Sequence, residues 1–144
     1  MKNMIALNVE GITKESVIEN LGKELFLHGK LNDLDTYIEA VKEREKEITT
    51  GFGGGIAIPH GKSDAVKESC FIFGKLKNKV EWKSMDQKPV DMVFQLAIPM
   101  EEAGTTHLRL LSKIAVAVME EKFVEKLRKA SSIEEIDAII NTIE

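Results

Sequence analysis

Cysteine is almost absent from this sequence, and its scarcity excludes two kinds of protein. Cys70 is the only cysteine among the 144 residues, so no internal disulfide forms and no cage of several thiolates can hold a zinc ion. Its position at the start of an apolar stretch is typical of a buried hydrophobic residue rather than of a nucleophile. The composition favours a reducing, cytoplasmic location.

Long hydrophobic runs and an excess of one charge are absent too. No segment reaches the apolar length of a membrane span, and residues 1–16 lack the apolar core of a signal peptide. Lysine and arginine number 20, aspartate and glutamate number 24, and the two signs are interspersed to give a net charge of -4. We therefore expect a soluble protein that neither inserts into a membrane nor binds nucleic acid.

The signatures of nucleotide binding are also missing. The glycine-rich segment GFGGG at residues 51–55 is neither a P-loop nor a dinucleotide fingerprint, because no GK[ST] follows it at the required spacing. We expect no nucleotide or other cofactor, and no metal ion.

What is present is enough apolar sequence for one domain. With 43% hydrophobic residues, the chain can build a real core over residues 1–144. Short apolar stretches bounded by turn formers predict strands at residues 4–9, 56–58, 70–76, 80–82 and 90–98. Helical spacing of apolar residues predicts helices from Thr13 to Gly29, from Asp33 or Asp35 to Thr49, over 106–119 and 121–130, and from Ser131 or Ser132 to Ile140.

This mixture of strands and helices predicts an α/β fold with helices on both faces of one sheet. Residues 90–98 are apolar apart from Asp91 and Gln95, which favours a central strand buried on both faces. In open α/β sheets ligands bind beyond the carboxyl ends of the strands. A proline directly follows both 56–58 and 90–98, so we expect the site just beyond them.

Two of the three histidines occupy such positions. His60 follows Pro59 at the end of one strand, and His107 begins a helix. A neutral imidazole is a competent nucleophile at physiological pH, and the hydrogen bond made by one ring nitrogen decides which nitrogen reacts. Proline fixes the backbone before His60, and the glycines of 51–55 remove bulk where a phosphate or another molecule must approach. His28, at a helix end, is assigned no chemistry.

His107 and Arg44 suit an anionic group. His107 follows two threonines that resemble helix caps, and the amides at a helix start favour anions. If the histidines converge, one attacks a phosphoryl group while the other stabilises its oxygens. Arg44 can add a guanidinium charge that matches phosphate geometry, although its KEREKE surroundings are equally typical of a solvated helix face.

Two segments carry a resemblance to a known family. REKEITTGFGGGIAIPHGKSDAVK, residues 44–67, and VDMVFQLAIPMEEAGTTHLRLLSKIA, residues 90–115, resemble the signature regions of the fructose/mannitol family of enzyme IIA (EIIA type 2). Members belong to the bacterial phosphoenolpyruvate-dependent sugar phosphotransferase system, and the resemblance spans essentially the whole chain. It implies a single α/β domain with a mixed sheet flanked by helices.

The same resemblance implies the residue roles and the partners. His60 corresponds to the phosphoryl acceptor, His107 to the ring that contacts the phosphate and Arg44 to the supporting cation. The donor is the carrier protein HPr, and the acceptor is a cysteine of enzyme IIB, which serves the membrane enzyme IIC in sugar uptake, with fructose as the sugar expected. We expect the chain to act separately from enzymes IIB and IIC, and Phe52, Ile56 and Met100 to offer apolar docking surface.

Two alternatives stay open at this point. A regulatory module of the same family would use the phosphorylation state of His60 to control another protein rather than uptake. A metal-dependent hydrolase would combine His60 and His107 with a carboxylate such as Asp64, although no HExxH-like spacing supports it.

Overall fold

A computed structural model describes residues 3–102 and 105–143, without the side chains of residues 102 and 105–108. The elements follow in the order β1 (Met4–Val9), α1 (Lys14–Leu27), α2 (Leu34–Glu47), β2 (Gly51–Gly53), β3 (Ile56–Ala57), β4 (His60–Ser63), β5 (Cys70–Val80), β6 (Val90–Pro99), the 3-10 turn η1 (Met100–Glu102), α3 (Thr105–Val118), α4 (Glu121–Lys129) and α5 (Ile133–Ile140). No helix among these described residues is long and apolar enough to cross a bilayer.

The strands form one mixed sheet around β6. The order is β1-β5-β6-β3-β2, and β4 also pairs with β6. β6 runs antiparallel to β5 and parallel to β3 and β4. All but one of its residues are buried, which confirms the predicted central strand.

β3 and β4 lie one after the other along the same edge of β6. Ile56 is opposite Met92 in this register, and His60 is opposite Leu96. The register is the same on both sides of Ile58 and Pro59, and Pro59 O accepts from Leu96 N–H at 2.9 Å. The segment of Ile58 and Pro59 lies directly before His60.

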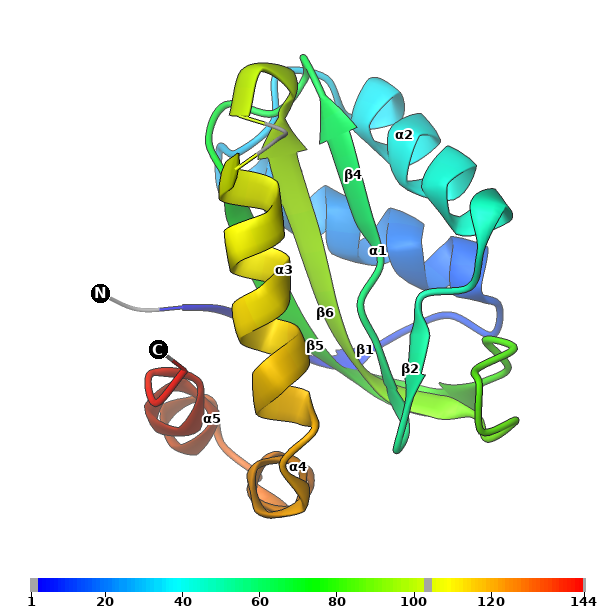
Figure 1. Cartoon of the computed structure of the whole chain (residues 1–144), viewed down its shortest axis with the longest axis vertical. Coiled ribbons are helices and arrows are strands. Elements are labelled where there is room, and N and C mark those ends of the chain that lie inside the picture. The colour runs from blue at the N-terminus through cyan, green and yellow to red at the C-terminus, as the bar shows by residue number, and fades with distance from the viewer. Residues whose placement is uncertain (1–2, 103–104, 144) are drawn as a thin grey trace.

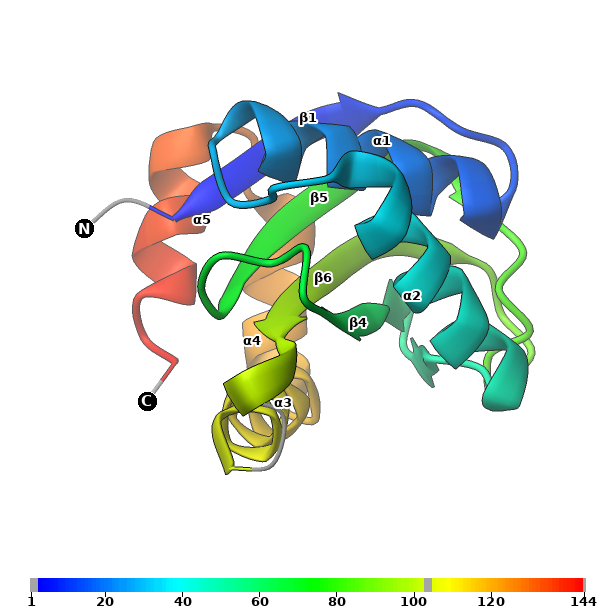
Figure 2. The same ribbon diagram turned by 90° about the horizontal axis from the view of Figure 1, so that it is seen from above.

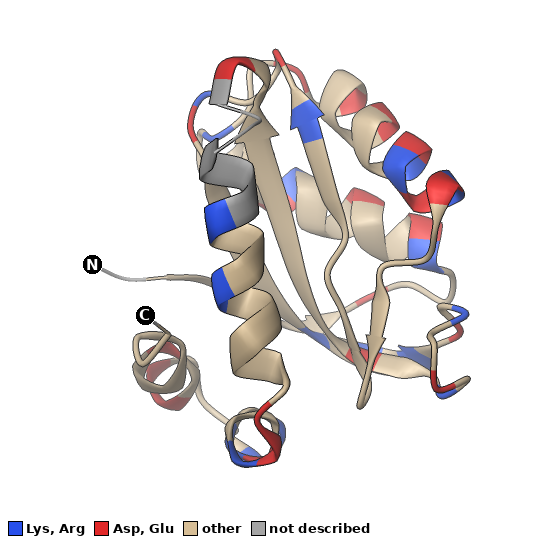
Figure 3. Cartoon of the chain, viewed as in Figure 1, with Lys and Arg blue, Asp and Glu red and all other residues tan. Residues whose placement is uncertain are grey.

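Helices cover both faces of the sheet, as the sequence predicts. Figure 2 shows α1 and α2 on one side of β5 and β6, with α3 and α4 on the other. Each face has its own apolar core, one built on Leu21, Tyr37 and Trp82 and the other on Phe94, Ile114 and Leu127. Acidic and basic residues are mixed along α1 and α2 (Figure 3), as their spread through the sequence indicates. The molecule is therefore a single α/β domain (Figure 1).

The predicted helix starts are confirmed by their caps. The side chains of Thr13, Asp33 and Ser132 each accept a hydrogen bond from the backbone N–H three residues further on. Such caps satisfy amides that have no partner inside the helix. Gly29 follows the end of α1 with a φ of 75°, a conformation that glycine adopts without strain.

The observed strands differ from the predicted ones in three ways. Residues 70–76 and 80–82 are not separate strands: β5 continues through Asn78 to Val80, because a register shift between Lys75 and Val80 accommodates the polar segment. Residues 51–53 of the glycine segment, where no strand is predicted, form β2. His60 lies beyond β3, as predicted, but it also begins a strand of its own, because pairing with β6 makes the polar stretch 60–63 extended.

Candidate active site

His60 is held in a buried position, and one of its ring nitrogens makes a defined hydrogen bond. It is only 6% exposed, and its Nδ1 lies 3.0 Å from the carbonyl oxygen of Ile58. Because a carbonyl oxygen only accepts, Nδ1 carries the proton and donates it. Nε2 is therefore the ring nitrogen with the lone pair, and it is the atom able to act as a nucleophile.

The backbone hydrogen bonds of Ile58 and Pro59 position the Ile58 carbonyl for this bond. Ile58 N–H donates to Thr50 O at 3.0 Å, and Leu96 N–H donates to Pro59 O at 2.9 Å. The backbone before the histidine is thus fixed on both sides, while the carbonyl of Ile58 serves the ring instead of the sheet. Pro59 has no N–H that would need a partner here.

Gly61 allows α2 to pack closely beside His60. A Cβ at this position would lie 2.8 Å from Val41 Cγ2 and 3.0 Å from the Val41 backbone nitrogen. Only glycine therefore permits the approach of α2 to β4. Arg44 lies one turn beyond Val41 on the same helix, so this approach brings it to the site.

The structure places Arg44 with His60, as the sequence predicts. Its Nη1 donates to Ile48 O at 2.9 Å, beyond the end of α2, and it shares two surface hollows with His60. Within the described part of the chain, no carboxylate forms an ion pair with Arg44. Its positive charge is therefore not neutralised by an ion pair with any described side chain.

The side chain of His107 lies outside the described residues. Its backbone belongs to the first turn of α3. Leu111 and Ala115 of the same helix line a hollow with His60, and position 107 precedes Leu111 by four residues, about one helical turn. The role of His107 stays a prediction.

Two hollows meet at His60 and Arg44. The apolar hollow, of about 400 Å³, is lined by Arg44, Ile48, Thr49, Thr50, Gly51, Phe52, Ile58, His60, Met85, Leu111 and Ala115. The polar hollow, of about 520 Å³, is lined by Ala40, Glu43, Arg44, Glu47, His60, Lys62 and Met100. His60 thus has an apolar surface on one side and charged groups on the other.

The surroundings of His60 keep its ring neutral. Burial is the main cause that lowers the pKa of His60 below the ordinary 6.5, and the positive charges of Arg44 and Lys62 lower it further. The hydrogen bond to Ile58 and the negative charge of Glu45 act in the opposite direction. The net effect favours the uncharged, nucleophilic imidazole at neutral pH.

A buried carboxylate supports the site and was not found from the sequence. Glu45 is 6% exposed, and its oxygens accept from Thr50 Oγ1 at 2.5 Å and from Thr50 N–H at 2.9 Å. Lys14 Nζ lies 3.5 Å from the same carboxylate. Glu45 therefore anchors the residue whose carbonyl holds Ile58. The available signal was spacing, because Glu45 continues the apolar face of Ile38 and Val41 inside a charged run.

The three residues expected to offer docking surface differ in exposure. Phe52 and Met100 are exposed, but Ile56 is fully buried, because it pairs with β6 inside the sheet. Ile48 and Met85 are apolar residues near His60 that the sequence analysis missed, with exposed fractions of 64% and 82%.

The glycines of 51–55 mostly serve the molecule itself rather than an approaching one. A Cβ on Gly51 would overlap the Ser84 side chain, and a Cβ on Gly55 would lie 2.8 Å from Asp91 Oδ1. Only Gly54 has open space around it, with nothing within 4 Å of such a Cβ. The expectation that these glycines admit another molecule is therefore wrong for Gly51 and Gly55.

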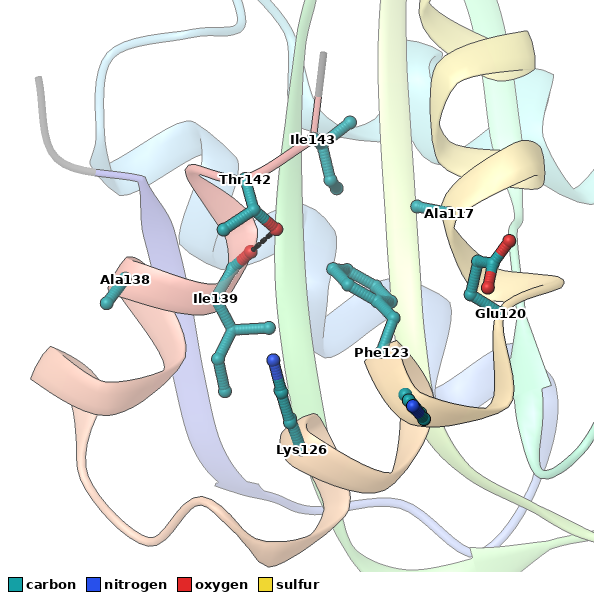
Figure 4. A pocket seen from close by; sticks show the side chains of 9 residues that line it. Ala117, Glu120, Phe123, Lys126, Ala138, Ile139, Thr142 and Ile143 are labelled. Carbon is teal, nitrogen blue, oxygen red and sulfur yellow. Dashed lines mark hydrogen bonds between the residues drawn. The ribbon is translucent and has the colours of Figure 1, made fainter.

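Other features lie apart from His60. A hollow of about 470 Å³ between the end of α3, α4 and α5 is lined by Phe123, Ile139 and Lys126 among others (Figure 4). Burial raises the pKa of Cys70 to about 11, which disfavours the reactive thiolate. Among the described residues, no three His, Cys, Asp or Glu side chains gather as a metal site would require.

Comparison with known families decides which family the chain belongs to. A family model described as "Phosphoenolpyruvate-dependent sugar phosphotransferase system, EIIA 2" matches residues 1–143. The chain belongs to this EIIA 2 family. The family predicted from residues 44–67 and 90–115 is thereby confirmed, and the EIIA 2 chain is a phosphoryl-transfer component of that system.

Relatives of two kinds resemble this EIIA 2 chain. The fructose-specific EIIABC component of Bacillus subtilis is 41% identical over 140 residues, which are 97% of this chain and 22% of that protein. The fructose-specific EIIA component of Haloferax volcanii is 35% identical, covering 95% of this chain and 88% of that one. The crystal structure of nitrogen regulatory protein IIA-Ntr from Neisseria meningitidis has a TM-score of 0.85 at 35% identity. The match covers 94% of this chain and 92% of that one. The EIIA 2 chain thus spans about a fifth of its EIIABC relative.

The electrostatics of the EIIA 2 site predict how His60 titrates. We expect its imidazole pKa, measured by NMR, to lie below 6.5, and Arg44→Gln to raise it, because a lowering positive charge is removed. Lys46→Gln removes the same charge from the same helix, where Lys46 is bonded to Glu43, and should leave the His60 pKa unchanged. An Arg44→Gln pKa equal to that of wild type would contradict the electrostatic role of Arg44.

Proposed function

We propose that His60 accepts a phosphoryl group from phospho-HPr on Nε2 and passes it to a cysteine of enzyme IIB during sugar uptake of the fructose type. The observation that supports this most is the hydrogen bond from Nδ1 to Ile58 O, which leaves the lone pair on Nε2. Family membership supports the reaction class, and the name of the Bacillus subtilis relative, a fructose-specific EIIABC component, supports the sugar and the IIB partner.

Both phosphoryl transfers proposed for His60 require mainly that the reacting groups are positioned. In the first step, the Nε2–P bond forms as the N–P bond in the phosphorylated carrier breaks. In the second, an S–P bond forms on the IIB cysteine as the Nε2–P bond breaks, and the imidazole leaves neutral. Phosphoryl transfer of this kind is accelerated mainly by in-line alignment and by charges on the equatorial oxygens.

The site must balance charges that are absent before the reaction. The phosphoryl oxygens carry a charge of about -2, and the ring, which keeps its Nδ1 proton, becomes cationic once Nε2 is bonded to phosphorus. Arg44 supplies one positive charge beside His60. We propose that His107 and the amides at the start of α3 supply the remaining stabilisation, since helix starts bind phosphate oxygens.

Docking of the two partners in turn calls for a small apolar surface. Ile48, Phe52, Met85 and Met100 are exposed apolar residues whose side chains line the two hollows at His60. A limited apolar surface suits a weak interface, so that HPr can leave before enzyme IIB binds. We propose these four residues as the rim that both partners share.

Phosphorylation by the purified carrier system tests this proposal. We expect phosphoenolpyruvate, enzyme I and HPr to label the wild-type chain with acid-labile phosphate, His60→Ala to abolish labelling, and His107→Ala to slow it. His28→Ala is a matched control, because His28 also bonds through Nδ1 to a backbone carbonyl, Glu24 O at 2.8 Å, but is exposed. Labelling of His60→Ala at the wild-type level would refute the assignment.

A regulatory role is the second candidate, since nitrogen regulatory protein IIA-Ntr from Neisseria meningitidis is 35% identical. Fructose uptake in the source organism distinguishes the two. We expect a strain carrying only His60→Ala to lose fructose uptake, because no phosphoryl group reaches enzyme IIB, whereas His28→Ala retains it. Normal uptake in the His60→Ala strain would favour regulation over transport.

A further inference from the structure

The hairpin of β2 and β3 places Phe52 at the site, but few contacts within the hairpin stabilise its tip, residues 53–55. β2 has only 3 residues and lies at the edge of the sheet, where it pairs with β3 alone through a shifted register. At the tip, Gly53, Gly54 and Gly55 have φ values of 113°, 66° and 83°. Three successive glycines in such conformations lose much backbone entropy on ordering. The tip therefore needs contacts from outside the hairpin.

Both backbone polar groups of Gly54 are held by side chains from other segments. Its N–H donates to Asp86 Oδ2 at 3.0 Å, and its carbonyl accepts from Arg128 Nη2 at 2.9 Å. The next carbonyl, of Gly55, accepts from the N–H groups of Asp91 and Met92 at 2.9 and 3.1 Å. The tip is thus tied to β6 and, through Arg128, to α4.

Arg128 is itself held in place. It contacts Asp91 through two pairs of atoms, Nη2 to Oδ1 at 2.7 Å and Nε to Oδ2 at 3.2 Å, the paired geometry that a guanidinium and a carboxylate prefer. Lys75 of β5 donates to the carbonyls of Arg128 and Ala130 at 2.9 and 2.6 Å, which anchors the end of α4. The guanidinium therefore reaches the hairpin from a rigid base.

We propose that Arg128, fixed by Asp91, is a positioning residue that holds the β2–β3 hairpin so that Phe52 is presented beside His60 to the docking partners. This rests on the function proposed above for His60. Arg128 does not line either hollow at His60, so it acts through the hairpin and not on the phosphoryl group.

Amide hydrogen exchange tests the clamp without any phosphorylation. We expect Arg128→Met, which keeps the apolar stem and removes the donors, to speed exchange at residues 53–55 by about threefold to tenfold. The remainder of the sheet should be unchanged. Lys129→Met removes the same charge from the next position, where the lysine pairs with Glu125 at 3.2 Å, and should leave these amides at wild-type rates. Unchanged exchange in Arg128→Met, or equally faster exchange throughout the sheet, would overturn the clamp.

Transfer kinetics test its consequence for docking. With phospho-HPr as substrate, Arg128→Met should raise KM by about threefold to tenfold with little change in kcat. The pKa of His60, measured by NMR, should stay at its wild-type value. Arg128→Lys should bring KM part of the way back towards the wild-type value, since one ammonium group replaces only some of the hydrogen bonds of the guanidinium. A reduced kcat at unchanged KM would contradict the positioning role. If wild-type protein accepts no phosphate, the proposed function fails, while the exchange experiment still decides whether the clamp exists.

Discussion

The hydrogen bond between His60 Nδ1 and the carbonyl of Ile58 is the constraint on which the other features of the site depend. It exists because the Ile58 N–H bonds to Thr50 O on the side away from β6, which leaves the Ile58 carbonyl out of the β6 ladder and within reach of the imidazole. Pro59 still pairs with β6 through its carbonyl, which accepts from Leu96 N–H, and it has no N–H that would need a partner. Gly61 admits α2 immediately afterwards.

In the proposed reaction, the site holds one ring in two charge states. Before transfer, burial and the positive charge of Arg44 favour a neutral imidazole by lowering its pKa. After the proposed transfer, the same positive charge would lie beside a dianionic group and stabilise it. Arg44 thus favours both states over a protonated histidine, which cannot accept phosphate at all. Membership of the EIIA 2 family is consistent with such a reversible carrier.

Much of this fold is readable from the sequence, because amphipathic spacing and capping residues mark the helices and an almost apolar run marks β6. What the sequence could not indicate depends on partners distant along the chain. β4 is polar and extended only because β6 lies beside it, and Ile56 is buried for the same reason. The sequence pointed to His60 and Arg44 as residues of the site. The burial of Glu45 and the contact of Arg128 with Gly54 could not be predicted, because they arise from packing between elements that are distant along the chain.

The most direct measurement of the central claim is NMR of the phosphorylated protein with ¹⁵N-labelled histidine, which identifies the ring nitrogen bonded to phosphorus. Because Nδ1 donates its proton to Ile58 O, the phosphorus should be bonded to Nε2 of His60, with Nδ1 still protonated. Phosphorus on Nδ1 of His60, or on another residue, would contradict the account.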